Sequence, residues 1–111
     1  MEKIITFEDF TKVDLRVGTI IEVNDFPEAR KPAYQLKIDF GDLGLKKSSA
    51  QITTLYKKEE LLNRQIVAVV NFPKKQIAKF MSECLVMGAV QANDVFLLNP
   101  EVKVKNGTTV N

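Results

Sequence analysis

Apolar and polar residues alternate almost without interruption near the start of the chain. The positions that share one face of residues 14–24 are Leu15, Val17, Thr19, Ile21 and Val23, and only Ile20 breaks the pattern. A period of two predicts a β-strand with one buried face. Gly18 lies inside this stretch, which indicates a bulge or bend of the kind that a strongly curled strand needs.

The same period returns further along the chain and predicts two more strands. In residues 34–40 it places Tyr34, Leu36, Ile38 and Phe40 on one face. A loop at 26–32 precedes this strand, and a glycine-containing turn follows it. Residues 45–52 are small and polar and predict a third strand. Residues 54–63 lose the alternation but contain three leucines, which predicts a short helix.

Residues 65–72 form the most continuously apolar part of the chain. The β-branched run from Ile66 to Val70 predicts a strand that is buried on both faces, with Phe72 in the core. After a loop that extends to Glu83, residues 84–90 predict a further buried strand and residues 95–98 a short one.

The chain ends predict smaller elements. Residues 6–12 predict a short helix, because Thr6 suits an N-cap and Asp9 stands at the capping-box spacing. Near the other end, Asn106-Gly107 predicts a turn.

The predicted order is three strands, a helix and two strands, which is the order of the OB-fold. We therefore expect an all-β protein: a five-stranded Greek-key barrel with a short helix between strands three and four and extensions at both ends. Other small barrels share part of this pattern, and the position of the helix decides the choice. The 111 residues suffice for one domain and are too few for two, so we expect a single domain over residues 1–111.

The amino-acid composition argues against an enzymatic function. The chain has no histidine and one cysteine, Cys84, so it lacks the commonest general base and the ligands of a zinc site. Ser48 and Ser49 have no histidine to activate them. We therefore expect that the protein is not an enzyme and that it binds no metal and no cofactor. We expect Cys84 to be a small buried hydrophobic residue.

No apolar run approaches the ~20 residues that cross a bilayer. The acidic first residues do not resemble a signal peptide, so we expect a cytoplasmic protein without membrane insertion.

Basic residues gather where an OB-fold binds its ligands. A net charge of +2 is too small for the whole molecule to attract a polyanion, so the charge must be local. OB-folds bind along strands two and three, between the loops that join strands one to two and four to five. Lysine is common in any loop, but eight of the 16 basic residues fall on this predicted surface, which indicates an anionic partner. They are Arg30, Lys31, Lys37, Lys46, Lys47, Lys74, Lys75 and Lys79.

Apolar residues in the same region suggest a second kind of ligand. Phe26 and Phe80 can stack on bases or fill the end of the barrel. Ile77, Phe80 and Met81 combine flexible and aromatic side chains, which suits the binding of varied unfolded segments. Phe26, Ile77, Phe80 and Met81 are therefore candidates for polypeptide binding, although Ile77 and Phe80 also fit a role in capping the barrel.

Several motifs resemble one family. They are Asp14-Leu15-Arg16-Val17-Gly18-Thr19-Ile20, Phe26-Pro27-Glu28-Ala29-Arg30, Ser48-Ser49-Ala50-Gln51-Ile52-Thr53, Val67-Ala68-Val69-Val70-Asn71-Phe72-Pro73, Ser82-Glu83 and Asn106-Gly107-Thr108. Together they span nearly the whole chain and resemble the CsaA family of secretion-related chaperones, part of the wider group of tRNA-binding OB domains. The resemblance implies a homodimer with the chain ends at its interface, a tRNA-binding surface and a role with unfolded or presecretory polypeptides.

The resemblance also implies individual site residues. The positions that match the family's signature between strands four and five are Asn71, Lys74, Lys75, Ser82 and Glu83, and Arg30 matches its first-loop motif. The chain departs from the family at Lys79, where glycine is common, and at Met81, where a basic residue is common. The positive charge that the family commonly has at the position of Met81 is thus found two residues earlier, at Lys79. Glu83 is also expected to anchor the end of a loop by hydrogen bonding.

Two functions remain open at this point. One is a chaperone for unfolded or presecretory polypeptides in protein export, with the capacity to bind tRNA. The alternative is a dedicated tRNA-binding module that acts in trans in tRNA handling or aminoacylation. In either case Val102 and Val104, which lie in a polar tail, predict pairing with a second copy of the chain.

Overall fold

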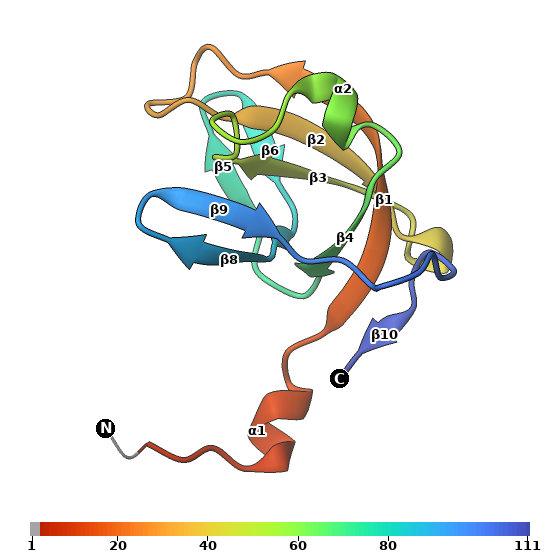
Figure 1. The fold of residues 1–111 in the computed structure, drawn as a ribbon. Coiled ribbons are helices and arrows are strands. Elements are labelled where there is room, and N and C mark those ends of the chain that lie inside the picture. Colours follow the sequence, from red (N-terminus) through yellow and green to blue (C-terminus); the bar gives the residue numbers. More distant parts are fainter. Residues whose placement is uncertain (1–2) are drawn as a thin grey trace.

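The structure is a computed structural model that describes residues 3–111 (Figure 1). Its elements in chain order are α1 (Phe7–Thr11), β1 (Leu15–Asp25), β2 (Tyr34–Asp39), a 3-10 turn (Gly41–Leu43), β3 (Leu45–Ala50), α2 (Lys58–Leu61), β4 (Gln65–Val69), β5 (Lys75–Ile77), β6 (Phe80–Ser82), β7 (Leu85–Val86), β8 (Gly88–Gln91), β9 (Asp94–Leu97) and β10 (Thr109–Val110).

One antiparallel sheet forms the body of the molecule. Its strand order is β3-β2-β1-β4-β7, and β10 also pairs with β1. Strand β1 reaches across the sheet because its first half pairs with β4 and its second half with β2. The sheet curls into a nearly closed barrel, and α2 lies between β3 and β4 in the chain (Figure 1). The predicted fold class is therefore confirmed.

The bulge of β1 lies away from the predicted position. The register with β2 shifts between Ile20 and Glu22, so the irregularity falls there and not at Gly18. Gly18 serves a different purpose, because a Cβ atom at this position would lie 2.7 Å from the side chains of Ile38 and Phe40. Its missing side chain lets these two residues pack directly against β1.

The core fills the inside of the barrel. Its largest fully buried apolar side chains are Phe40, Ile20, Leu36, Ile38, Leu61 and Ile66. All five residues of β4 are buried, as the apolar run predicts. The strand ends at Val69, however, and Phe72 lies beyond the sheet. The prediction that Phe72 is in the core is therefore wrong, since its side chain is 49% exposed.

Three other elements differ from the sequence prediction. Helix α2 has four residues and is shorter than the predicted 54–63. Residues 73–83, expected as a loop, contain the hairpin of β5 and β6. The expected strand 84–90 is divided into β7 and β8, and Val90 is 71% exposed. Short strands with few apolar residues take their conformation from their pairing partners, so their own pattern is weak. Within residues 3–111, no helix is long and apolar enough to cross a membrane.

Side-chain hydrogen bonds attach the C-terminal segment to the barrel. The amide of Gln65 donates to the Val104 carbonyl oxygen at 2.7 Å and accepts from the Val104 N–H at 3.0 Å, as a neighbouring strand would. The Asn106 amide oxygen accepts from the Thr19 hydroxyl at 2.6 Å. The predicted turn is confirmed by Gly107, whose φ is 90°. The Gln65 side chain thus bonds both backbone groups of Val104. Neither group is then free to pair with a strand of a second chain.

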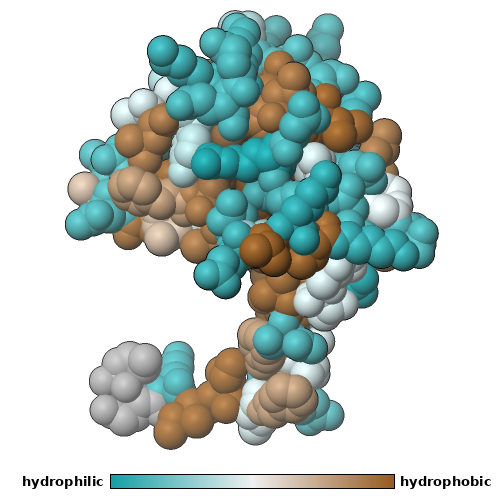
Figure 2. Space-filling view, turned by 45° about the vertical axis from the view of Figure 1, so that its right-hand side comes forward, coloured by the Kyte–Doolittle hydropathy of each residue, from teal (hydrophilic) through white to brown (hydrophobic). Residues whose placement is uncertain are grey.

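Residues 4–11 form an N-terminal arm that stands away from the barrel (Figures 1 and 2). The predicted capping box is confirmed, because the Thr6 hydroxyl accepts from the Asp9 N–H and the Asp9 carboxylate accepts from the Thr6 N–H. Ile4, Ile5 and Phe7 of this arm are 92%, 63% and 75% exposed. The arm therefore presents apolar side chains to its surroundings.

Candidate ligand-binding surface

The segment Ser82-Glu83 covers the free edge of β3. The Lys47 N–H donates to Glu83 Oε1 at 2.9 Å, and the Glu83 N–H donates to the Lys47 carbonyl oxygen at 2.7 Å. The Ser49 N–H donates to Ser82 Oγ at 3.2 Å. Side chains thus satisfy the edge where strand pairing stops. The predicted role of Glu83 as an anchor is confirmed.

These bonds hold the β5–β6 hairpin against β3. The hairpin pairs Lys75 with Ser82 and Ile77 with Phe80, and the turn between them contains the exposed Lys79. Lys74 precedes the hairpin, and its ammonium lies 3.9 Å from the Glu83 carboxylate. This pair is too exposed on the lysine side to contribute much stability. It leaves Lys74 available to an anionic ligand.

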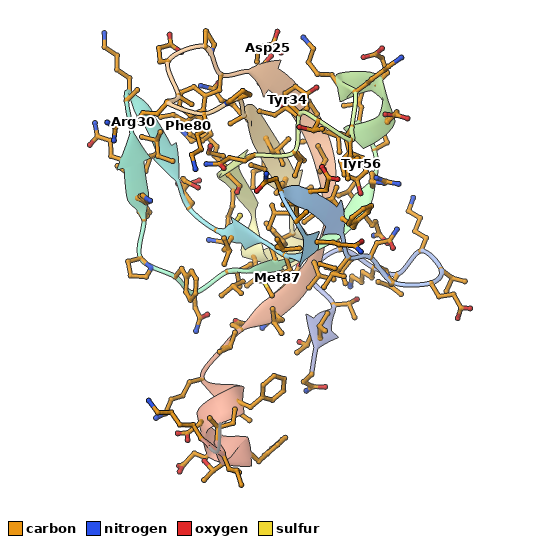
Figure 3. All side chains as sticks on the ribbon, turned by 60° about the vertical axis from the view of Figure 1, so that its left-hand side comes forward. Asp25, Arg30, Tyr34, Tyr56, Phe80 and Met87 are labelled. Atoms are coloured by element: carbon orange, nitrogen blue, oxygen red, sulfur yellow. The ribbon has the colours of Figure 1, made fainter. Side chains whose placement is uncertain are left out.

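A basic groove of about 560 Å³ separates the hairpin from the β1–β2 loop. Arg30 and Lys31 line it from the loop, and Lys75 lines it from the hairpin. Figure 3 shows Arg30 and Phe80 on the same side of the molecule. Within the described chain, Glu28 is the only acidic residue of this lining. Of the basic residues predicted in the two loops, Arg30, Lys31 and Lys75 line this groove, whereas Lys74 and Lys79 are outside its lining.

Strands β1, β2 and β3 present a polar outer face next to this groove. Cross-strand pairs arrange it in two rows, which are Glu22-Lys37-Lys47 and Asn24-Gln35-Ser49. The Lys37 ammonium lies 3.5 Å from the Glu22 carboxylate. Lys46 pairs with the buried Ile38 and so points to the other side of β3. The prediction that Lys46 shares the outer face with Lys47 is therefore wrong, because successive side chains of a strand alternate.

A cavity of about 250 Å³ opens on the outer face beside the hairpin. Its lining residues are Glu22, Asn24, Gln35, Leu36, Lys37, Lys47 and Phe80. The Lys47 ammonium lies 5.3 Å from the centre of the Phe80 ring, within the range of a cation–π contact. Phe26 packs against Phe80 with ring centres 5.4 Å apart. Because Phe26 is only 4% exposed, it supports Phe80 and offers little surface to a ligand.

An apolar cavity of about 550 Å³ also borders β5. Its apolar lining residues include Ile77, Leu85, Val86, Met87, Val90, Val95 and Leu97. Among the predicted polypeptide-binding residues, Ile77 lines this cavity, whereas Phe26, Phe80 and Met81 do not. The sequence prediction missed residues 85–97 because it treated 84–90 as a buried strand. Lys75 and Ile77 line both the apolar cavity and the basic groove, so β5 is a wall of both.

Cys84 lies where the hairpin anchors meet β3. Its side chain is buried, and its thiol is 3.8 Å from the Lys47 carbonyl oxygen. Burial raises the pKa of the Cys84 thiol to about 11, because the thiolate would lose its hydration. The thiol is therefore neutral at pH 7, and the expectation of a small buried hydrophobic residue is confirmed.

Asn71 acts as a second anchor, at the base of the N-terminal arm. Its amide oxygen accepts from the Asp14 N–H at 3.0 Å, and its amide nitrogen donates to the Lys12 carbonyl oxygen at 2.7 Å. The side chain thus joins the end of β4 to the segment between α1 and β1. The resemblance implied a tRNA contact at Asn71, whereas the structure uses this amide to hold the backbone.

Comparisons with known proteins agree with this architecture. Residues 15–109 match the model of a family described as a putative tRNA binding domain. The chaperone CsaA of Bacillus anthracis has a solved structure that is 54% identical to this chain, with a TM-score of 0.93 over 98% of this chain and all of that one. The CsaA chaperone protein of Picrophilus torridus is 57% identical, with a TM-score of 0.91 over 97% of this chain and all of that one.

A methionine--tRNA ligase of Pyrococcus abyssi is 42% identical over 109 residues. The match covers 98% of this chain but only 15% of the length of that ligase. The fold and its basic groove define a barrel domain of the tRNA-binding class. The chain belongs to the putative tRNA-binding domain family and, within it, to the CsaA family, as its motifs predict.

Proposed function

We propose that this protein is a non-enzymatic binding protein of the CsaA type, which holds unfolded or presecretory polypeptides and also binds tRNA. It works as a single domain, as a homodimer and in the cytoplasm, where both ligands occur. The observation that carries the proposal is the position of β5, which is a wall of both a basic groove and an apolar cavity.

The basic groove supports the tRNA part of the proposal. Arg30, Lys31 and Lys75 face a single acidic residue, Glu28, so the lining has an excess of positive charge. Such a groove neutralises phosphates and releases their counterions, whatever the base sequence. Structured RNA is recognised largely by shape and backbone, which fits the separation of the positive charges onto two loops.

A salt titration tests the tRNA part. We expect the logarithm of the association constant to fall linearly with the logarithm of salt concentration, with a slope of roughly −2 to −4 for three to five phosphate contacts. Replacing Lys74 and Lys75 with glutamate weakens binding of every tRNA by roughly 10- to 100-fold. Lys103→Glu is the matched control, since Lys103 lines a separate cavity with Arg64. Binding that is insensitive to salt excludes this mechanism.

The apolar cavity supports the polypeptide part. Its volume of about 550 Å³ and its Val, Leu, Ile and Met lining suit apolar side chains of an unfolded chain. Met87 adds a flexible, polarisable side chain that adapts to ligands of different shape. Val90, at the rim, is 71% exposed although it is apolar, which leaves it free to contact a client.

Suppression of aggregation tests the polypeptide part. We expect the protein to delay aggregation of an unfolded client at stoichiometric amounts, and Val90→Asp to reduce this protection by at least severalfold. Leu45→Asp is a matched control, because Leu45 is 56% exposed and lies outside the apolar cavity. Equal protection by both variants contradicts the assignment of this cavity.

The similarity to methionine--tRNA ligases supports the alternative, a tRNA-binding module that acts in trans during aminoacylation. Under this alternative, adding the protein lowers the KM of a methionyl-tRNA synthetase for tRNA, and client aggregation is unaffected. An unchanged KM together with protection of clients favours the chaperone.

The N-terminal arm supports the homodimer. Ile4, Ile5 and Phe7 have little contact with their own barrel, and their exposure is costly in water. A second copy of the chain that packs against this arm removes that cost and adds to the modest core of a 111-residue protein.

A further inference from the structure

The cavity on the outer face is lined by polar side chains that line neither the basic groove nor the apolar cavity. Within residues 3–111, the side-chain amide of Gln35 makes no hydrogen bond, so both its donor and its acceptor are free. The Asn24 amide nitrogen donates to Glu22 Oε2 at 2.8 Å, which fixes the amide plane and leaves its oxygen as an acceptor. The Phe80 ring forms the wall opposite these polar groups, on the hairpin.

We propose that this cavity receives one unpaired nucleobase of a bound RNA. The assignment rests on the proposed RNA binding and adds to it a preference for single-stranded nucleotides. The Phe80 ring offers a stacking partner, and the free amide of Gln35 matches the donor and acceptor edge of a base. A base inside a duplex already uses that edge and stacks on its neighbours, so only an unpaired base can enter.

The cavity lies directly beside the basic groove. Ser49 lines the basic groove and is the cross-strand partner of Gln35, which lines the cavity. An RNA strand held by Arg30 and Lys75 therefore passes the rim of the cavity. The Lys47 ammonium lies 5.3 Å from the centre of the Phe80 ring, so this face of the ring is accessible to a cation. A base takes that place, and the displaced ammonium then meets the phosphate next to it.

The lining distinguishes a base from an apolar peptide side chain. Five of its seven residues carry charged or amide side chains, and these are Glu22, Asn24, Gln35, Lys37 and Lys47. An apolar side chain placed there would remove water from these groups without replacing their hydrogen bonds. The apolar cavity on β5 is the better position for such a side chain, whereas a base satisfies both the ring and the amides.

A pair of RNAs that differ only in their bases tests the proposal. Fluorescence anisotropy at one fixed salt concentration compares a short single-stranded RNA with its abasic analogue, which keeps every phosphate. We expect the natural RNA to bind roughly 5- to 150-fold more tightly, the range that stacking of one base supplies. Gln35→Leu removes the hydrogen bonds to the base and keeps the Phe80 ring, so it should lower this ratio in part. Lys75→Ala is the control, and it should weaken both RNAs alike while the ratio stays unchanged.

The wild-type protein supplies a second measurement that does not depend on the folding of any variant. NMR signals of the Phe80 ring and the Gln35 side-chain amide should shift with the natural RNA and not with the abasic one. Equal affinity for the two RNAs overturns the base cavity but leaves salt-dependent tRNA binding intact. Shifts of these signals with an unfolded polypeptide, and not with RNA, also overturn it, because the cavity is then a peptide site.

Discussion

The β5–β6 hairpin and the N-terminal arm are attached to the barrel in the same way but present opposite chemistry. The hairpin is held by Ser82 and Glu83, which bond the free backbone edge of β3. The arm is held by Asn71, which bonds the backbone of Lys12 and Asp14. Beyond these anchors the hairpin presents lysines, whereas the arm presents Ile and Phe side chains.

This difference separates the anchors from the ligand-binding residues. The resemblance implied site roles for Asn71, Ser82 and Glu83, and the structure uses all three to position an attached segment. A polar side chain that bonds an otherwise free backbone group holds a segment without any apolar contact. These three residues therefore place the two segments, and we expect the residues at the exposed ends to decide what each segment binds.

The largest expected effect concerns the arm. Replacing Ile5 and Phe7 together with aspartate removes two exposed apolar side chains from each copy of the chain and should weaken the proposed dimer by roughly 100-fold or more. Analytical ultracentrifugation measures the change in mass. Val90→Asp, an equally polar change near the hairpin, should leave the dimer intact. An undiminished dimer in the arm variant contradicts the proposed interface.

The next effect concerns the thiol beneath the hairpin. A pKa of about 11 in place of 9.0 leaves roughly one hundredth of the thiolate at neutral pH, so alkylation of Cys84 should be about 100-fold slower than that of an exposed cysteine. The rate should rise about tenfold for each pH unit and continue to rise above pH 9, where an ordinary thiol levels off. Mass spectrometry of iodoacetamide-treated protein measures this rate. A plateau near pH 9 contradicts the burial of the thiol.

The hairpin anchor comes third. Glu83→Ala leaves the Lys47 N–H without its acceptor and should lower the free energy of unfolding by about 1–2 kcal/mol. Glu83→Gln keeps an acceptor oxygen and should cost only a few tenths of a kcal/mol, because the lost pair with Lys74 is largely exposed. Urea denaturation measures both values. Faster alkylation of Cys84 in the alanine variant alone would show that the hairpin has loosened.

The smallest effect concerns the arm anchor. Asn71→Ala removes two hydrogen bonds in an exposed region and should lower the free energy of unfolding by about 0.5–1.5 kcal/mol. Asn71→Asp keeps the acceptor for the Asp14 N–H and should recover part of this loss. At equal protein concentration, both variants should show the same tRNA affinity as the wild type. A uniform loss of tRNA affinity in Asn71→Ala would return this residue to the ligand surface.

The sequence pattern predicts the strands of the barrel, but it does not predict the short elements that shape the candidate site. The alternation in β1 and β2 and the apolar run of β4 reveal the sheet because core burial acts on every second residue. The hairpin of β5 and β6 escapes detection because its strands have three residues each and few apolar positions. Its pairing becomes visible only when its partner strand is present.

The same reasoning explains which residues of the candidate surface the sequence predicts. Charge indicates Arg30, Lys31 and Lys75, which line the basic groove, since cations in loops near a predicted face need no exact orientation. Lys46 was misplaced because the side of a strand depends on its register. Gln35 and Asn24 were missed because a polar residue in a strand resembles an ordinary solvated face until a ring from another segment lies opposite it.

Strand β5 has a further consequence, because Lys75 and Ile77 line both of the cavities that we propose for the two ligands. A tRNA in the basic groove and a client in the apolar cavity both contact Lys75 and Ile77, so each should lower the affinity of the other by the same factor. Free tRNA would then act as a competitor that limits how long an exported chain is held. The concentration of one ligand would then control the release of the other, without a conformational change of the barrel.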